Sequence, residues 1–202
     1  LIMLISAFAA LVSMGAAPRA SIRMGEGDYA GAERILGNSF TLLLLVSLVL
    51  TPIFTLLREP LLLAFGATEN TIQYASDYMN IYALGTIFVQ LALGLNAFIT
   101  AQGYAKISMF TVLIGAVSNI VLDPLFIFVL DMGISGAAIA TLFSQCVSFL
   151  ILLSFFLMGK SACQLRLSNA FRSIRIYGVI VKTGLPTLAR QGLASAAAGG
   201  LN

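Results

Sequence analysis

The stretch IGAVSNIVLDPLFIFVL, residues 114–130, is almost entirely apolar, yet it holds an amide, a carboxylic acid and a proline close together. Asn119 and Asp123 stand one helical turn apart, and Pro124 follows at once. A run of roughly 20 apolar residues is what an α-helix needs to cross a bilayer. This stretch therefore predicts a membrane-spanning helix with a polar point inside it.

The rest of the chain has the same apolar character. Of its 202 residues, 59% are hydrophobic and 9% are charged, against about 25% charged in an ordinary soluble domain. The apolar runs lack the apolar–polar alternation of transmembrane β-strands. The predicted fold class is therefore all-α, a polytopic transmembrane helical bundle. With the charges as boundaries, spans are expected at approximately 1–18, 35–57, 78–101, 107–130 and 134–158, with the start of a sixth near 183–202.

The charges of the loops fall into two groups on alternate connections. One group of connections is predominantly basic and contains Arg19, Arg23, Arg34, Lys106, Lys160, Arg166, Arg172, Arg175 and Lys182. The other contains Arg58, Glu59, Glu69, Asp77 and Asp131. Because Lys and Arg favour the cytosolic side, the basic group is predicted to face the cytosol. The net charge of +3 thus belongs to one membrane face and does not indicate a nucleic-acid partner.

Three segments have a predicted structural role. Residues 19–35, RASIRMGEGDYAGAERI, can form a short helix on the cytosolic side. The basic connection 159–182 is expected to lie along the inner leaflet, attracted by anionic lipid, and to act as a hinge between two halves of a larger protein. A stripe of small residues in the fifth span predicts a helix-packing face and consists of Gly136, Ala140, Ser144 and Ser148. The chain opens at Leu1 inside a hydrophobic run, so we expect a piece of a longer protein with a further helix upstream.

Asp123 is the first functional candidate, because a charged aspartate in the hydrocarbon region costs about 2.5–3.5 kcal/mol on insertion scales. Residues four apart on a helix share a face, so Asn119 and Asp123 can present oxygens to one point. Pro124 has no N–H and leaves the carbonyl of Ile120 without its usual donor. These oxygens suit a hard monovalent cation or a proton on the acid, about 10 Å below the outer surface. The alternative is an interhelical hydrogen-bond network without a ligand.

Enzymatic chemistry finds little support in the sequence. GISG, residues 133–136, matches the serine motif of intramembrane proteases, but the chain contains no histidine to act as its base. No dinucleotide, phosphate or zinc pattern occurs, and Cys146 and Cys163 have no metal or redox spacing. We therefore expect no enzyme and no cofactor. The remaining polar residues in the spans are individually typical of helix-to-helix hydrogen bonds: Tyr78, Gln90, Asn96, Thr141 and Gln145.

SNIVLDPLFIFVLDMGISGAAIATLFSQ, residues 118–145, strongly resembles multidrug and toxic compound extrusion (MATE) transporters, in which Asn-x-x-x-Asp-Pro is followed by Gly-x-x-Gly-Ala-Ala-x-Ala-Thr. GAAPRASIRMGEGDYAGAER, LNAFITAQGYAK and TGLPTLARQGLASAAAGGLN resemble further parts of the same family. The resemblance implies twelve helices in two six-helix lobes. It divides this chain into most of a first lobe (1–158, helices two to six), a basic inter-lobe connector (159–182) and the start of a second lobe (183–202, helix seven).

The resemblance also implies a function: Na⁺- or H⁺-coupled antiport that exports drugs and organic cations across the plasma membrane by alternating access. The family's cation site corresponds to Asn119 and Asp123 through the Asn-x-x-x-Asp-Pro motif, and to Thr141 through the segment AIATLFSQ. Asn96 and Tyr78 correspond to further site residues by their spacing between the matching motifs. The family's first-helix carboxylate does not occur in this chain, which leaves the choice of ion open.

The expected partners are small cationic or amphiphilic substrates and membrane lipids, with a monomeric full-length protein in a bacterial or archaeal inner membrane. Two alternatives stay open. One is a flippase for lipid-linked saccharides of related architecture, which would need basic residues in its spans for pyrophosphate, whereas the in-span charge here is an acid apart from Arg190. The other is a helical membrane module that transports nothing.

Overall fold

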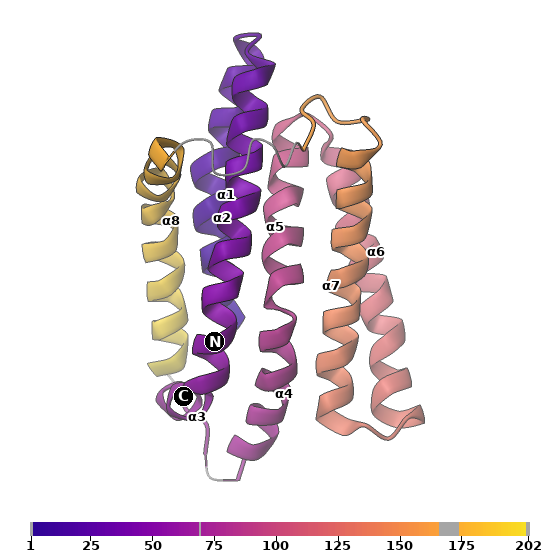
Figure 1. The fold of residues 1–202 in the computed structure, drawn as a ribbon. Coiled ribbons are helices and arrows are strands. Elements are labelled where there is room, and N and C mark those ends of the chain that lie inside the picture. Colours follow the sequence, from indigo (N-terminus) through magenta and orange to yellow (C-terminus); the bar gives the residue numbers. More distant parts are fainter. Residues whose placement is uncertain (1, 69, 166–173, 201–202) are drawn as a thin grey trace.

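The computed structural model describes residues 2–68, 70–165 and 174–200, and this part of the chain is a helical bundle without strands (Figure 1). The elements are α1 (Ile2–Gly25), α2 (Tyr29–Leu56), α3 (Arg58–Ala64), α4 (Ile72–Leu84), α5 (Thr86–Ala101), α6 (Ala105–Pro124), the π-helical turn η1 (Leu125–Val129), α7 (Gly133–Leu157) and α8 (Ile174–Gly200). The predicted all-α class is confirmed.

The predicted spans are found with shifted ends. α1, α2, α6 with η1, and α7 are each long and apolar enough to cross a membrane. α4 and α5 make a fifth candidate together, bent by 56° where they meet. α8 begins at Ile174 rather than near 183, and over its described residues it does not reach the hydropathy of the other spans. Its place as a further span stays a prediction.

The segment between the first two spans is not the separate short helix that the sequence suggested. α1 continues to Gly25 and α2 begins at Tyr29, so only a tight turn separates them. Asp28 caps α2 by accepting the N–H of Gly31 (N to Oδ1 2.8 Å), and the guanidinium of Arg23 binds Asp28 at 3.2 Å. Extending a formed helix costs less than nucleating a new one, so these polar residues prolong the two spans instead.

Hydroxyl groups stabilise the bend between α4 and α5. Gly85 occupies the break, so close to α7 that an added Cβ would press on a leucine side chain there. The carbonyl of Ala83 accepts a hydrogen bond from Thr51 of α2 (3.1 Å), and that of Tyr82 accepts one from Thr86 (3.4 Å). A carbonyl freed by a helix break needs such a partner where water is absent. The bend is therefore supported by specific side chains from two helices.

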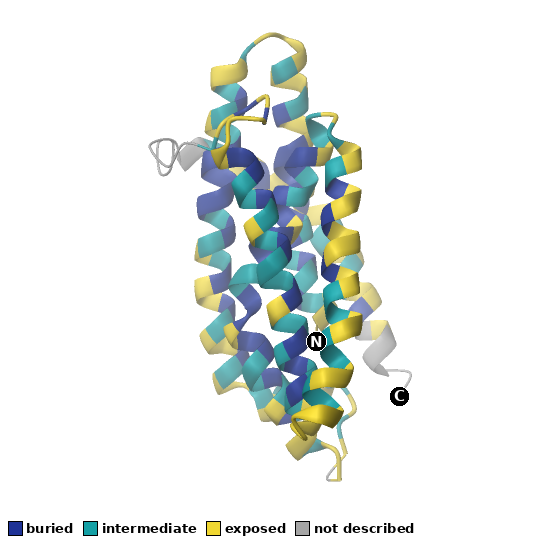
Figure 2. Ribbon diagram, turned by 90° about the vertical axis from the view of Figure 1, so that its right-hand side faces the viewer, coloured by how far each residue is buried: buried dark blue, intermediate teal, exposed yellow. Residues whose placement is uncertain are grey.

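α1 forms the centre of the bundle and α6 forms its edge. α1 packs on α2, α5 and α8, while α7 contacts α4, α5 and α6. Figure 2 shows buried residues along the interior of the bundle and exposed ones toward the turns at its ends. On α6 the buried residues are Ser108, Thr111 and Gly115, which are all small or polar. The buried face of this edge helix is thus unlike an ordinary apolar core face.

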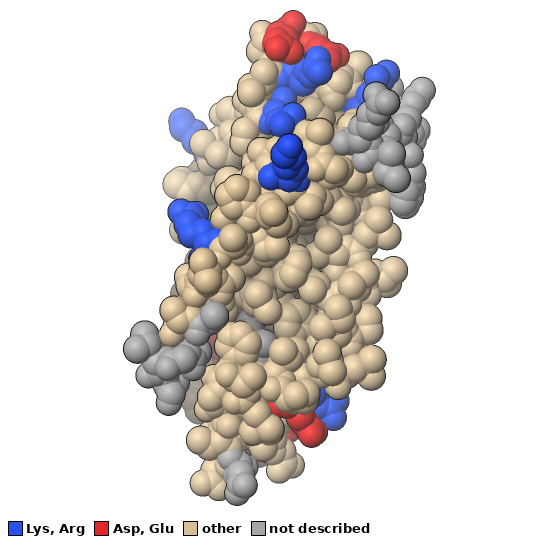
Figure 3. Space-filling model, turned by 90° about the vertical axis from the view of Figure 1, so that its left-hand side faces the viewer, with Lys and Arg blue, Asp and Glu red and all other residues tan. Residues whose placement is uncertain are grey.

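The predicted basic connections meet at one end of the bundle. Ser21 Oγ donates to the carbonyl of Ala101 (3.1 Å), and Ser161 Oγ donates to Gln102 Oε1 (2.6 Å). The α1–α2, α5–α6 and α7–α8 connections therefore adjoin one another, which confirms that they lie on one side. Figure 3 shows Lys and Arg side chains gathered toward this end, above a broad belt without charged side chains.

The chain after α7 folds back onto this same end. The backbone N–H of Cys163 donates to Gln102 Oε1 (3.3 Å), and that of Gln164 donates to Glu33 Oε1 (3.1 Å). The first part of the predicted connector is thus fixed to α5 and α2. Of the remainder, residues 166–173 lie outside the described residues, and 174–182 belong to α8.

The burial of Cys163 leads to a prediction about its reactivity. Desolvation, with a smaller contribution from the negative charge of Glu33, raises the pKa of this thiol to about 11. At pH 8 the thiolate fraction is therefore about 100-fold below that of an ordinary cysteine. We expect maleimide to label Cys163 at least that much more slowly than a cysteine placed at the exposed neighbour, in Ala162→Cys combined with Cys163→Ala. The labelling rate of each protein is measured between pH 7 and 9, with Cys146 replaced by alanine in both. Equal rates at positions 162 and 163 would contradict the prediction.

Candidate cation-coupling site

The candidate site is built on one face of α6. Thr111, Gly115, Asn119 and Asp123 follow one another at intervals of four residues, and such residues lie above one another on a helix. α7 packs against α6 and brings its small-residue stripe to this face: a Cβ on Gly115 would overlap Ser148 Oγ. The stripe is a packing face, as its sequence predicted, and it also contributes polar groups to the site.

A cavity of about 270 Å³ lies between α5, α6 and α7. The polar residues that line it are Asn96 from α5, Thr111 and Asn119 from α6, and Thr141, Ser144, Gln145 and Ser148 from α7. The structure thus brings together three predicted site residues, Asn96, Asn119 and Thr141. The lining supplies amide and hydroxyl oxygens, which are ligands that hard cations accept.

Asp123 lies one turn beyond this cavity and is half-buried. Its Oδ1 accepts a hydrogen bond from Asn119 Nδ2 (3.2 Å), so the predicted pairing on one helix face is present. Within the described part of the chain, Asn119 Oδ1 and Asp123 Oδ2 have no hydrogen-bond donor. The structure therefore places the acid at the end of the cavity, joined to it through Asn119, with free oxygen lone pairs on both side chains.

Pro124 ends the regular part of α6 directly after the acid. The π-helical turn that follows is closed by the N–H of Leu130 donating to the carbonyl of Leu125 (3.0 Å). Because proline has no N–H, the carbonyl of Ile120 lacks its usual donor four residues on. Backbone and side-chain oxygens thus gather around one turn, next to Asp123. Among the described residues no three of His, Cys, Asp or Glu come together.

The amide of Asn96 is already engaged by α6. Its Nδ2 donates to the carbonyl of Ser108 (3.1 Å), and its Oδ1 accepts from Ser108 Oγ (2.8 Å). Thr100 Oγ1 donates in turn to Ser108 Oγ (2.8 Å). Asn96 therefore docks α5 onto α6 and fixes one wall of the cavity. The hydroxyl of Thr141 donates to the carbonyl of Ala137 in its own helix (3.0 Å), which leaves its oxygen lone pairs available.

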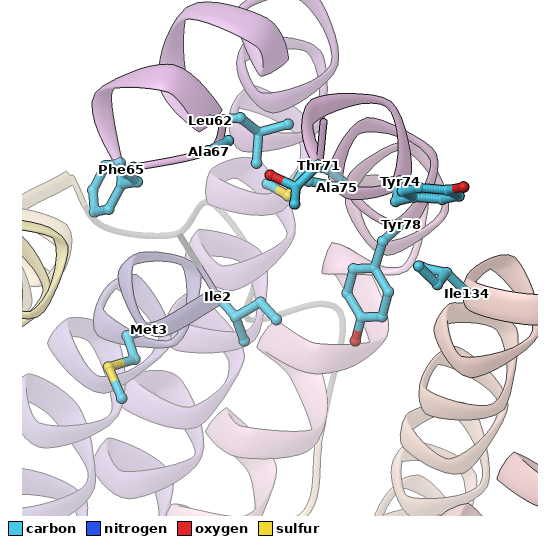
Figure 4. A pocket seen from close by; sticks show the side chains of 12 residues that line it. Ile2, Met3, Leu62, Phe65, Ala67, Thr71, Tyr74, Ala75, Tyr78 and Ile134 are labelled. Carbon is cyan, nitrogen blue, oxygen red and sulfur yellow. The ribbon is translucent and has the colours of Figure 1, made fainter. Parts of the chain in front are cut away.

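Tyr78 lies apart from the other predicted residues. It lines a separate cavity of about 640 Å³ at the opposite end from the basic connections, between the start of α1, α3, α4 and the start of α7. Its ring lies between Ile2 and Ile134 (Figure 4) and is stacked with Tyr82, with ring centroids 6.0 Å apart. The lining is mainly apolar, with hydroxyl groups from Thr71, Tyr74 and Tyr78. This outer cavity is distinct from the one at Asn119.

Sequence reasoning did not assign Thr111, Ser144 and Ser148 to the site. Helical spacing places each of them on one face with a predicted residue of its own helix: Thr111 stands two turns before Asn119, and Ser144 and Ser148 stand three and seven residues after Thr141. What the sequence could not show is which faces of α6 and α7 meet.

Comparison with known proteins identifies the family. The MatE family model matches residues 1–125, more than half of the 202 residues. This chain belongs to the MatE family. The family resemblance read from residues 118–145 and the other motifs is therefore confirmed. The chain is a multi-pass membrane protein, and its described residues contain four to five candidate spans.

Several MatE relatives resemble this chain over nearly its whole length. Multidrug export protein MepA of Staphylococcus haemolyticus (strain JCSC1435) is 29% identical over 180 residues, which are 89% of this chain and 40% of that protein. A structure described as the inward-facing conformation of a multidrug resistance MATE family transporter has 29% identity and a TM-score of 0.87, covering 94% of this chain and 43% of that one. An outward-facing conformation has 28% identity and the same TM-score, covering 94% and 42%. The chain spans about two fifths of the curated relatives it matches.

The contact between Gly115 and Ser148 predicts a coupled pair of substitutions. Gly115→Ala should destabilise the α6–α7 pairing by about 1–3 kcal/mol, because its Cβ meets the Ser148 hydroxyl. Ser148→Ala removes that oxygen, so the double variant should recover most of the loss and show a coupling of about 1–2 kcal/mol. The stabilities of the wild type, the two single variants and the double variant are compared by thermal unfolding of the purified proteins in detergent. Gly25→Ala, where a Cβ meets nothing within 4 Å, is the control, and strictly additive effects would contradict the contact.

Proposed function

We propose that the full-length MatE protein is a cation-coupled antiporter, driven by Na⁺ or H⁺, that exports drugs and organic cations across the plasma membrane by alternating access. The observation that carries this proposal is the Asn119–Asp123 pair, with free oxygens, at the end of a cavity lined by amide and hydroxyl groups. The names of the relatives, a multidrug export protein and multidrug resistance transporters, support the same function.

The energetic role of Asp123 follows from its surroundings. An ionised carboxylate inside the spans is stabilised by a bound cation or is neutralised by a proton, and either occupant removes its charge. Asn119 Oδ1 and the hydroxyl oxygen of Thr141, which both line the cavity, are the predicted partners for a bound Na⁺. If the two access states stabilise the empty, charged site to different extents, they have different affinities for the ion. That difference is what couples ion movement to a conformational change.

The outer cavity supports the proposed class of cargo. Its apolar walls suit the hydrocarbon part of an amphiphile, and its hydroxyl groups offer hydrogen bonds without a charge. The acid at Asp123 favours cations over anions. A flippase for lipid-linked saccharides would need cationic side chains to hold a pyrophosphate. The acidic in-span charge therefore favours the export of cationic drugs over that alternative.

Alternating access is supported by the similarity to both inward-facing and outward-facing structures. The two matches have the same TM-score, 0.87, and each covers 94% of this chain. Only 6% of the chain lies outside each match, and α8, with 27 of the 202 residues, makes up about 13% of the chain. Both matches therefore include part of α8. Residues 1–158 would then move largely as one body, and the change of access would arise from their movement against the second lobe, which begins with α8.

The proposed organisation follows the division expected from the sequence. Residues 1–158 supply most of a first lobe, 159–182 the connector, whose last part, 174–182, already belongs to α8, and 183–202 the start of a second lobe. The full-length protein would act as a monomer, in contact with membrane lipids and its small-molecule cargo, without a cofactor.

The decisive test is the replacement of Asp123 in the full-length protein. We expect Asp123→Asn to reduce dye efflux from cells to the level of cells without the transporter, with unchanged amounts of protein in the membrane, because an amide neither binds a proton nor carries the charge that attracts Na⁺. The assay is run with Na⁺ and pH gradients imposed separately, so that the wild type identifies its ion.

Asp131→Asn is the matched control. Asp131 is an exposed acid that follows η1, with a φ of 51°, a conformation that Asn adopts readily. This variant should export like the wild type. Normal efflux by Asp123→Asn would reject the coupling role and favour a purely structural acid, as in a helical module that does not transport.

A further inference from the structure

α1 and α8 touch through their backbones at one level of the bundle. A Cβ built on Gly15 of α1 would overlap the carbonyl oxygen of Ile180 in α8, and one built on Gly184 would overlap the carbonyl oxygen of Leu11. All four residues are buried. Each helix thus offers one glycine and one carbonyl, four residues apart, and the two pairs are reciprocal.

This geometry restricts some movements and permits others. Sliding either helix along its axis would replace a glycine at the contact by a neighbour that carries a side chain, and the backbones would have to separate. A change of tilt about the same point moves the contact atoms very little. Small residues that bring backbones together are a principal means of holding helices in lipid, where no hydrophobic force draws them together. The contact therefore resists translation more than rotation.

A polar contact supports the same pair of helices nearer the basic end. Arg19 Nη2 of α1 donates to Thr183 Oγ1 of α8 (3.1 Å), one residue before Gly184. The two helices run antiparallel, since Leu11 and Gly15 meet Gly184 and Ile180 in reverse order. α8 adjoins α1 on the left of Figure 1, away from α6 and α7. The glycine contact is thus on the opposite side of the bundle from the coupling site.

We propose that the contact of Gly15 with Gly184 is the pivot of the transport cycle. α1 and α8 stay joined at this point in both access states, while the rest of the second lobe changes its tilt against the first. The inference rests on the proposed function, because a pivot has meaning only in a protein that alternates between two states. The inference adds to that function the two residues, Gly15 and Gly184, about which the second lobe tilts against the first.

The first test measures the contact directly in the full-length protein. Spin labels are attached to Arg19→Cys and Thr183→Cys together, with Cys146, Cys163 and any other cysteine replaced by alanine. Dipolar broadening of the spectrum is recorded in Na⁺, in Na⁺-free buffer and at acidic pH. We expect strong broadening of the same shape in every condition, whereas a loss of broadening in any of them would overturn the pivot. The singly labelled Arg19→Cys protein is the control.

The second test uses a short bifunctional thiol reagent on the same double-cysteine protein. Cross-linking a pivot leaves the movement free, so dye efflux should stay within about twofold of the untreated protein, whereas closing a gate would stop it. Arrest of efflux by the cross-link would overturn the inference. If the wild-type protein exports nothing, the proposed function fails instead, and the spectra still decide whether the contact is fixed.

Glycine replacements test the close approach itself. Gly15→Ala and Gly184→Ala should each lower the initial rate of dye efflux by at least about tenfold, because the added methyl group forces the backbones apart. Gly178→Ala and Gly192→Ala lie in the same helix α8 and have nothing within 4 Å of the new Cβ, so these controls should stay within about twofold of the wild type. Equal rates in all four variants would show that the contact has no role in transport.

Discussion

The structure depends on one constraint: a backbone surrounded by apolar groups must find its hydrogen-bond partners inside the protein. Helices meet this need along most of the chain. Where a helix is interrupted, a specific side chain takes over, as Thr51 does for the freed carbonyl of Ala83 at the bend between α4 and α5. The π-helical turn after Pro124 is another answer to the same need, because its wider hydrogen bonds continue the ladder beyond the missing N–H.

The same constraint separates structural polar residues from candidate ligands. Most hydroxyl groups in the spans donate to a carbonyl of their own helix, as Ser13 does to Ala9 and Thr41 to Gly37. Such residues are satisfied locally and need no ligand. The pair of Asn119 and Asp123 is different, because one hydrogen bond between the two side chains leaves further oxygens unused. An acid inside the spans is costly unless it is paired, protonated or bound to a cation, and this cost is the basis of the proposed site.

Much of this could be predicted from the sequence, because charge and hydropathy fix which segments lie inside the membrane. The five spans, the sorting of the loops to two ends and the shared face of Asn119 and Asp123 all follow from the positions of the residues along the chain. The extension of α1 and α2 beyond their apolar runs did not follow, since polar residues can prolong a helix as well as end it. The contact of α6 with α7, and hence the hydroxyl groups of the cavity, depends on helix rotation, which spacing alone does not determine.

The position of Pro124 ties the candidate site to the next helix. The N–H of Met132 donates to the carbonyl of Phe126 in η1 (3.1 Å), and a Cβ on Gly136 of α7 would stand only 2.7 Å from that same oxygen. One carbonyl thus joins the turn after Asp123 to the first turn of α7 through backbone atoms alone. Because backbones in direct contact have no rotamers with which to absorb a shift, the end of α6 and the start of α7 must move together. A change of occupancy at Asp123 that alters this turn would therefore act on α7, and with it on Thr141, on the other wall of the cavity.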